Sequence, residues 1–286
     1  MSFSQRVRHA TALTRQSWAM LREQTSLLIL PLVSGLCLAL ISATFLAPIV
    51  ASEEFRTALE GRTPDTQVLD YAYLFVFYLV AFTVMNIFNG ALLHCVLARI
   101  EGRPASVGAG LAAALGRLPQ ILAWSLVSAT IGVALNVLRD KAGNLGKFVA
   151  GAAGLAWSIA TYFAFPLVMA DGTGPFASIT GSSKLVRRTW GESALANVGV
   201  TLVFGLVVAV LVVVFAVLFV AVASTLPTAA AVAVVVLFGV ALGLTVLVAS
   251  TVSMVIRGAL FAYARNGVVP QPFDQAALAS VIHPKR

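Results

Sequence analysis

Charged residues are scarce in this chain of 286 residues: Asp, Glu, Lys and Arg together make up 10% of it. A soluble globular domain carries about 25% charged residues. Hydrophobic residues make up 59% of the chain, and they are concentrated in runs long enough to cross a bilayer. The composition therefore excludes a water-soluble globular enzyme and predicts a single integral membrane domain over residues 1–286.

Cysteine and histidine are also scarce, with two and three residues in the whole chain. Cys37 lies within one apolar run and Cys95 near the end of another, and this spacing matches neither a disulfide framework nor a metal site. The sequence contains no Gly-rich phosphate-binding loop, no His-Glu-x-x-His zinc motif and no Gly-x-Ser-x-Gly elbow. We therefore expect no cofactor, no metal and no catalytic site.

Six apolar runs are each long enough for a helix that crosses the hydrocarbon core, which takes about 20 residues. They cover approximately Leu27–Ala51, Tyr71–Ala98, Gln120–Leu138, Phe148–Ala170, Val198–Ser224 and Ala229–Ile256. The last two runs are separated only by residues 225–228 (TLPT), where Pro227 predicts a tight turn because proline cannot continue a helix without strain. The expected fold is an all-α polytopic membrane helix bundle with six transmembrane spans.

Basic residues are distributed unevenly between the two ends of these spans. If both termini lie on one side, that side carries 14 of the 19 Lys and Arg residues and the other side carries five. Because cytoplasmic loops are enriched in Lys and Arg, both termini are predicted to be cytoplasmic. The net charge of +8 arises at the ends of apolar runs, so the expected partners are anionic lipid headgroups and not nucleic acid.

Three segments on the predicted cytoplasmic side have the pattern of amphipathic helices. In the first, at the N-terminus, Arg8, Arg15 and Arg22 line the flank of an apolar face. The stripes of the second and third are formed by Val107, Leu111, Ala114 and Leu118, and by Phe176, Ile179, Ser183, Val186 and Trp190. An apolar face with a basic flank is typical of helices that lie in the membrane interface. The alternative, compatible with the first, is that these faces pack against the ends of the bundle.

Polar residues within the apolar runs fall on stripes of helical spacing. Asn86 and Asn89 share one face of the second run, and Ser125 belongs to a similar stripe on the third. Small and hydrogen-bonding residues usually join membrane helices to one another, so contacts between helices are the first interpretation. The alternative is a path for a small or lipidic solute along the polar faces of the second, third and fourth runs.

Charged residues after the fourth run are candidate binding residues. Asp171 opens the turn Asp-Gly-Thr-Gly-Pro, in which Pro175 is suited to the first position of a helix. We expect a turn in which Asp171 pairs with Arg187 or Arg188. Arg188 and Glu192 receive the same structural interpretation, and headgroup binding or catalysis is the alternative for this group.

Short motifs recur along the chain. Residues 13–18 (LTRQSW) match residues 185–190 (LVRRTW). Residues 90–92 and 258–260 are both Gly-Ala-Leu, followed by Arg99 and Arg265. These matches predict parallel repeat units over residues 1–104, 105–170 and 171–270.

Several motifs in a fixed order also carry a family resemblance. They are residues 14–18 (TRQSW) with 30–32 (LPL), 110–119 (GLAAALGRLP), 154–158 (GLAWS) with Pro166, 174–175 (GP) and 185–192 (LVRRTWGE). Together they resemble a family of bacterial multi-span membrane proteins classed as a domain of unknown function. The helix that ends in Ser/Thr-Trp is more distantly similar to the membrane domain attached to some glycerophosphodiester phosphodiesterases, which implies no activity here because no soluble catalytic domain is present. The resemblance implies a fold in a bacterial inner membrane and no reaction.

The function expected from the sequence is that of a non-enzymatic inner-membrane protein that organises lipids or partner proteins. Its membrane surface contacts would be made by the N-terminal arginines and the candidate residues around Asp171. The alternative function is a transporter or channel for a small or lipidic solute, with its path along the polar faces described above.

Overall fold

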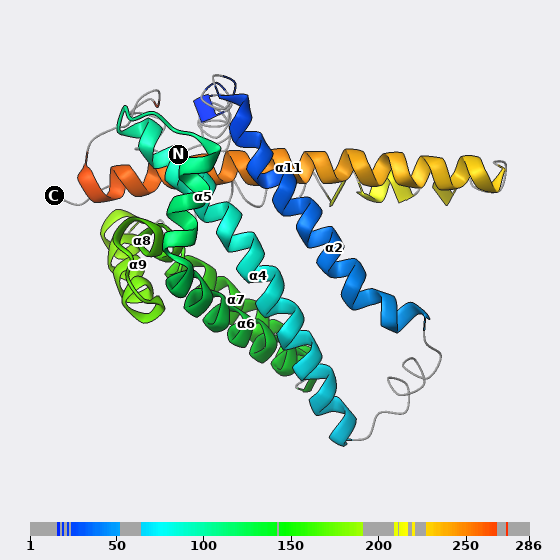
Figure 1. The fold of residues 1–286 in the computed structure, drawn as a ribbon. Helices are drawn as coiled ribbons and strands as arrows, with labels where there is room; N and C mark the ends of the chain where they lie inside the picture. The colour runs from blue at the N-terminus through cyan, green and yellow to red at the C-terminus, as the bar shows by residue number, and fades with distance from the viewer. Residues whose placement is uncertain are drawn as a thin grey trace, which may run out of the picture.

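The computed structural model describes residues 16, 17, 19, 22, 24–51, 64–141, 143–190, 209–210, 212–216, 219–220, 227–267 and 273. Within these ranges every regular element is a helix (Figure 1), which confirms the all-α prediction. The elements are the 3-10 helix η1 (Thr25–Leu28) and the α-helices α2 (Ile29–Ala51), α4 (Pro64–Ile100), α5 (Val107–Gly116), α6 (Leu118–Lys141), α7 (Gly143–Ala160), α8 (Ala164–Asp171), α9 (Pro175–Trp190) and α11 (Thr228–Asn266).

Five helical stretches among the described residues are long and apolar enough to cross a membrane. They are Thr25–Ile49, Asp70–Ile100, Leu118–Asp140, Gly146–Asp171 and Ala229–Asn266. These stretches correspond to the first, second, third, fourth and sixth predicted spans. The predicted fifth span, Val198–Ser224, lies largely outside the described residues. The described part of the chain thus has the helices of a multi-span membrane protein.

Helices α4 and α11 are longer than the apolar runs that predicted them. α4 begins at Pro64 instead of near Tyr71, and α11 continues to Asn266 instead of ending at Ile256. The residues after Ile256 keep the helical spacing of apolar side chains, so Arg257 interrupts the apolar composition without ending the helix. At 1.5 Å per residue, α4 and α11 are each about 55–60 Å long, well beyond the ~30 Å of the hydrocarbon core.

The fourth predicted span is divided into α7 and α8 by a turn at residues 161–163. Pro166 accounts for this division, because proline donates no backbone hydrogen bond and its ring clashes with the carbonyl four residues earlier. α9 packs beside α8 and partners the backbone groups that the turn frees: the N–H of Phe163 donates to Ser182 Oγ at 2.9 Å, and Ser183 Oγ donates to the carbonyl of Ala160 at 3.4 Å. The two serines therefore hold the broken helix against α9.

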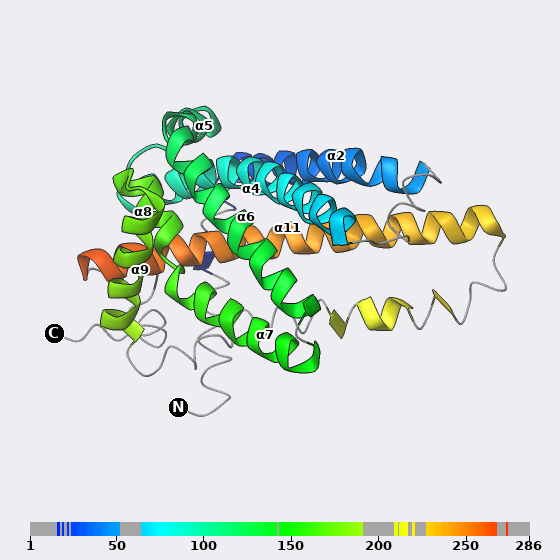
Figure 2. The ribbon, with the colours of Figure 1, turned by 90° about the horizontal axis from the view of Figure 1, so that it is seen from below.

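The buried core lies at one end of the bundle, where the predicted cytoplasmic ends of the helices meet. It includes the start of α2, the C-terminal part of α4, most of α8 and the C-terminal half of α11, with Leu30, Leu93, Phe163 and Leu260 at most 1% exposed. Away from this core, α2 and the N-terminal half of α11 carry many exposed leucine and valine side chains. Figures 1 and 2 show that the N-terminal half of α11 extends well past the core.

Helix α5, the second predicted amphipathic helix, packs on the C-terminal part of α4. Its Ala114 is fully buried. Gly110 permits the close approach, because a Cβ at this position would lie 2.6 Å from the carbonyl oxygen of Ala91 and 2.7 Å from Cys95 Sγ. The stripe of α5 therefore faces the protein, as the alternative of packing against the bundle requires.

Helix α9, the third predicted amphipathic helix, also packs on the bundle. Val186 and Ser182 are buried against it, whereas Phe176 at the start of the helix is 75% exposed. Contact of α5 and α9 with the membrane interface stays a prediction. The first amphipathic segment lies outside the described residues except for residues 16, 17, 19 and 22.

We predict that Gly110→Ala lowers the free energy of unfolding by about 1–3 kcal/mol, the usual cost of overpacking a close contact. The added methyl group would meet a backbone carbonyl of α4 that can move only with its helix. Gly108→Ala is the matched control on the same helix, because nothing lies within 4 Å of a Cβ there. Unfolding in detergent micelles measures both variants, and equal stabilities would contradict the close packing of α5 on α4.

Candidate functional site: a charged cavity at the end of the bundle

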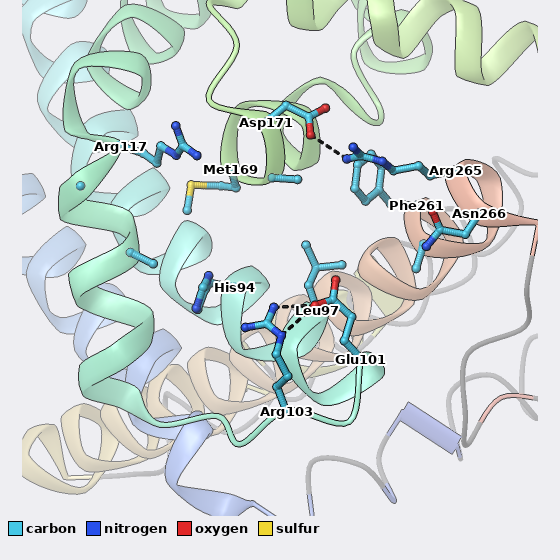
Figure 3. Close-up of a pocket in the computed structure, with 14 residues that line it drawn as sticks. His94, Leu97, Glu101, Arg103, Arg117, Met169, Asp171, Phe261, Arg265 and Asn266 are labelled. Atoms are coloured by element: carbon cyan, nitrogen blue, oxygen red, sulfur yellow. Dashed lines mark hydrogen bonds and ion pairs between the residues drawn. The ribbon is translucent and has the colours of Figure 1, made fainter.

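A cavity of about 640 Å³ opens at the same end of the bundle as the core (Figure 3). Four parts of the chain line it: the end of α4 with the loop that follows, the junction of α5 and α6, the end of α8, and the end of α11. Its polar lining residues are His94, Glu101, Arg103, Arg117, Asp171, Arg265 and Asn266. The cavity thus brings together charged groups from the ends of helices that are far apart in the sequence.

An ion pair joins α11 to α8 at one side of the cavity (Figure 3). Arg265 Nη1 donates to Asp171 Oδ1 at 2.7 Å, and the two side chains are 47% and 30% exposed. The expected pairing of Asp171 with Arg187 or Arg188 is wrong. Both arginines are exposed on α9, and Arg187 lies twelve residues, or about 18 Å, along that helix from Pro175.

A second ion pair lies in the loop that follows α4. Arg103 Nε and Nη2 both donate to Glu101 Oε2, at 2.9 and 2.5 Å. Both side chains are 56% exposed, so this local pair contributes little to stability, at most about 1 kcal/mol. Figure 3 shows Arg103 and Arg117 on different sides of the open space.

Arg117 differs from the other two arginines of the cavity, because it forms no ion pair with any described residue. Its guanidinium lies against Gly172: a Cβ on that glycine would be 2.6 Å from Arg117 Cζ. Gly172 has a φ of 65° and donates its N–H to the carbonyl of Val168, which ends α8. The negative end of a helix dipole favours a cation, so the end of α8 is a favourable position for the Arg117 guanidinium, whose charge no carboxylate of a described residue pairs.

The cavity also has an apolar wall. Leu97, Met169 and Phe261 line it beside the charged groups, and the guanidinium carbon of Arg265 lies 6.0 Å from the centre of the Phe261 ring. Cationic groups next to an apolar wall suit a ligand that carries an anionic group on an apolar or amphipathic body. Among the described residues, no group of three His, Cys, Asp or Glu side chains is placed to hold a metal ion.

The polar residues of the stripes do not line this cavity, and two of them join α4 to α6. Asn86 Nδ2 donates to Ser125 Oγ at 3.1 Å in a buried contact between α4 and α6. Asn136 Nδ2 donates to the hydroxyl of Tyr78 at 3.3 Å between the same two helices. Asn89 is half-buried on α4. Side-chain hydroxyls that donate to carbonyls of their own helix are those of Thr83, Ser158 and Thr161.

Among the other candidates from the sequence, Arg22 and Arg188 are exposed. Arg8, Arg15 and Glu192 lie outside the described residues. Of the candidates that lie among the described residues, only Asp171 lines the cavity. The residues that sequence reasoning missed are Arg103, Arg117 and Arg265, and the signal for them was their common place on the basic, predicted cytoplasmic side of the chain.

A model of a protein family described as a family of unknown function (DUF6159) matches residues 68–270. This match includes all the residues that line the cavity. No curated protein and no solved structure matches the chain.

We predict that Gly172→Ala lowers the free energy of unfolding by about 1–2 kcal/mol, because a side chain in the left-handed region is strained. The methyl group would also displace the Arg117 guanidinium from the end of α8. Gly174→Ala, two residues later, is the control, since a Cβ there has open space around it and no positive φ. Thermal unfolding in detergent compares the two, and an equally small effect of both substitutions would contradict the role of Gly172.

Proposed function

The chain belongs to DUF6159, a family of unknown function, and we propose that it organises anionic lipids at the cytoplasmic end of its helix bundle without catalysing a reaction. The membrane would be the inner membrane of a bacterium. The observation that carries the proposal is the cavity at one end of the bundle, where arginines from three parts of the chain meet beside an apolar wall. Anionic headgroups are the abundant ligands at that position of a membrane protein.

The outer surface of the bundle supports lipid contact. Leu36 and Leu40 on α2 are 62% and 61% exposed, and Val236 and Leu237 on α11 are 58% and 69% exposed. Exposed apolar surface of this extent marks a membrane or protein interaction site. On helices long enough to cross a bilayer, acyl chains are the simplest partner.

The hydrogen bonds inside the bundle favour this function over a solute path along the second, third and fourth predicted spans. A path needs polar groups that are free to exchange partners with a solute. Asn86 and Ser125 instead bond to each other, and Asn136 bonds to Tyr78. These contacts are the usual means by which membrane helices associate.

We infer six spans with both termini on the cytoplasmic side. α9 follows α8 directly at the cavity end of the bundle, whereas α11 reaches that end only with its C-terminal residues (Figure 1). Since α11 is 39 residues long, or about 58 Å, its start lies far from α9. The residues between Trp190 and Thr228 must connect the two ends, and the predicted fifth span Val198–Ser224 has the length to do so.

This topology predicts that residue 60 is outside the cell. In a background with Cys37 and Cys95 replaced by Ser, Glu60→Cys should react with a membrane-impermeant maleimide added to intact spheroplasts. Arg187→Cys, on the exposed face of α9, is the opposite control and should react only after the membrane is opened. Labelling of position 60 from the cytoplasmic side alone would reject the six-span topology.

The lipid proposal predicts that the purified protein retains phosphatidylglycerol and cardiolipin above their share of the membrane. Native mass spectrometry after extraction in a mild detergent measures this enrichment. Because salt screens exposed charges, the enrichment should fall as the extraction buffer is raised from low to high ionic strength.

Retention of lipids in the proportions of the membrane itself would contradict a lipid-organising function. Reconstitution of the same preparation into liposomes provides the comparison with the transport alternative. Protein-dependent flux of a solute without lipid enrichment would support a path through the protein in place of lipid organisation.

A further inference from the structure

We propose that the cavity between the ends of α4, α6, α8 and α11 binds a phosphate group, with Arg117 as its principal ligand. This inference deepens the proposed function and rests on it only for the source of the phosphate. A phospholipid headgroup and a soluble phosphate ester present the same oxygens to a guanidinium, and the experiment below distinguishes these two sources.

Arg117 is a cation of the cavity with unused hydrogen-bonding capacity. It lines the cavity and forms no ion pair with a described residue. Its guanidinium lies against Gly172 at the end of α8. A planar guanidinium matches two phosphate oxygens at once, and such charge-assisted pairs are stronger than neutral hydrogen bonds.

The other charges of the cavity leave it net positive. Arg265 and Asp171 neutralise each other, as do Arg103 and Glu101. The three arginines outnumber the two carboxylates, so the unpaired charge is that of Arg117. Arg103 and Arg265 line other parts of the same cavity, and their carboxylate partners occupy only part of each guanidinium.

The size and lining of the cavity also fit a ligand that carries a phosphate group. A volume of about 640 Å³ lies within the range of about 300–1,000 Å³ that is usual for ligand sites. The apolar side chains of Leu97, Met169 and Phe261 form part of the lining. They offer contact to the glycerol and upper acyl carbons of a phospholipid, or to the organic part of a soluble ester.

The test measures the unfolding temperature of the full chain in phosphatidylcholine nanodiscs. The first arm adds phosphatidylglycerol to the nanodiscs. The second arm adds inorganic phosphate, compared with chloride at equal ionic strength. Arg117→Gln removes the proposed ligand, and Arg187→Gln removes one exposed arginine of the same helix-bundle end that does not line the cavity.

We expect phosphatidylglycerol to raise the unfolding temperature of the wild type and of Arg187→Gln at similar lipid contents. Arg117→Gln should need about tenfold more anionic lipid than the wild type for half of the maximal rise in unfolding temperature. Arg117→Lys keeps the positive charge but loses the planar guanidinium, so its half-maximal lipid content should lie between those of the wild type and Arg117→Gln. The unfolding temperature in pure phosphatidylcholine shows whether each variant is folded before any ligand is added.

Four outcomes decide between the ideas. Stabilisation by phosphatidylglycerol that needs Arg117 supports a phosphate site in the cavity that is occupied by a lipid headgroup. Stabilisation by inorganic phosphate alone that needs Arg117 supports the cavity and overturns the lipid-organising function. Equal stabilisation of all variants by phosphatidylglycerol overturns the cavity site and leaves that function standing. Stabilisation by neither ligand overturns both.

Discussion

A helix that breaks within a membrane protein frees backbone groups that must find partners inside the protein, because lipid offers none. Here the break follows from Pro166, and α9 supplies the hydroxyl partners through Ser182 and Ser183. The same contact places α8 as a short separate helix whose C-terminus reaches Arg117. The two serines thus support the helix whose end lines the charged cavity, although neither serine lines the cavity itself.

The sequence predicts the helices better than it predicts their contacts. Hydrophobic runs are a property of neighbouring residues, so five of the six expected spans can be matched to described helices. The turn after Asp171 and the start of α9 at Pro175 follow from local chemistry in the same way. The sequence does not predict the extension of α11 past Arg257, because a charged residue ends an apolar run without ending the helix.

The site was beyond the reach of sequence reasoning for a different reason. Asp171 and Arg265 are 94 residues apart, and a pair at that distance depends on how α8 and α11 pack. Arg187 and Arg188 were nearer in sequence and therefore the natural partners to expect, yet a helix carries them away from Asp171. The charge asymmetry predicts that Arg117 and Arg265 lie on one side of the membrane, but it contains no information on which helix ends adjoin.

The spacing of two arginines along the third predicted span indicates how deep in the membrane the cavity would lie. Arg117 precedes α6 directly and Arg139 lies near its other end. The two cations are 22 positions apart, which corresponds to about 33 Å along the helix, close to the ~30 Å of the hydrocarbon core. No charged residue lies between them, so the two arginines fit the two edges of the hydrocarbon, since each guanidinium is costly to bury in lipid. In the proposed topology, Arg117 would be level with the headgroup phosphates on its side. A lipid phosphate would then reach it by lateral diffusion alone, without lifting its acyl chains from the membrane, and we therefore favour a lipid over a soluble ester as the proposed source of the phosphate.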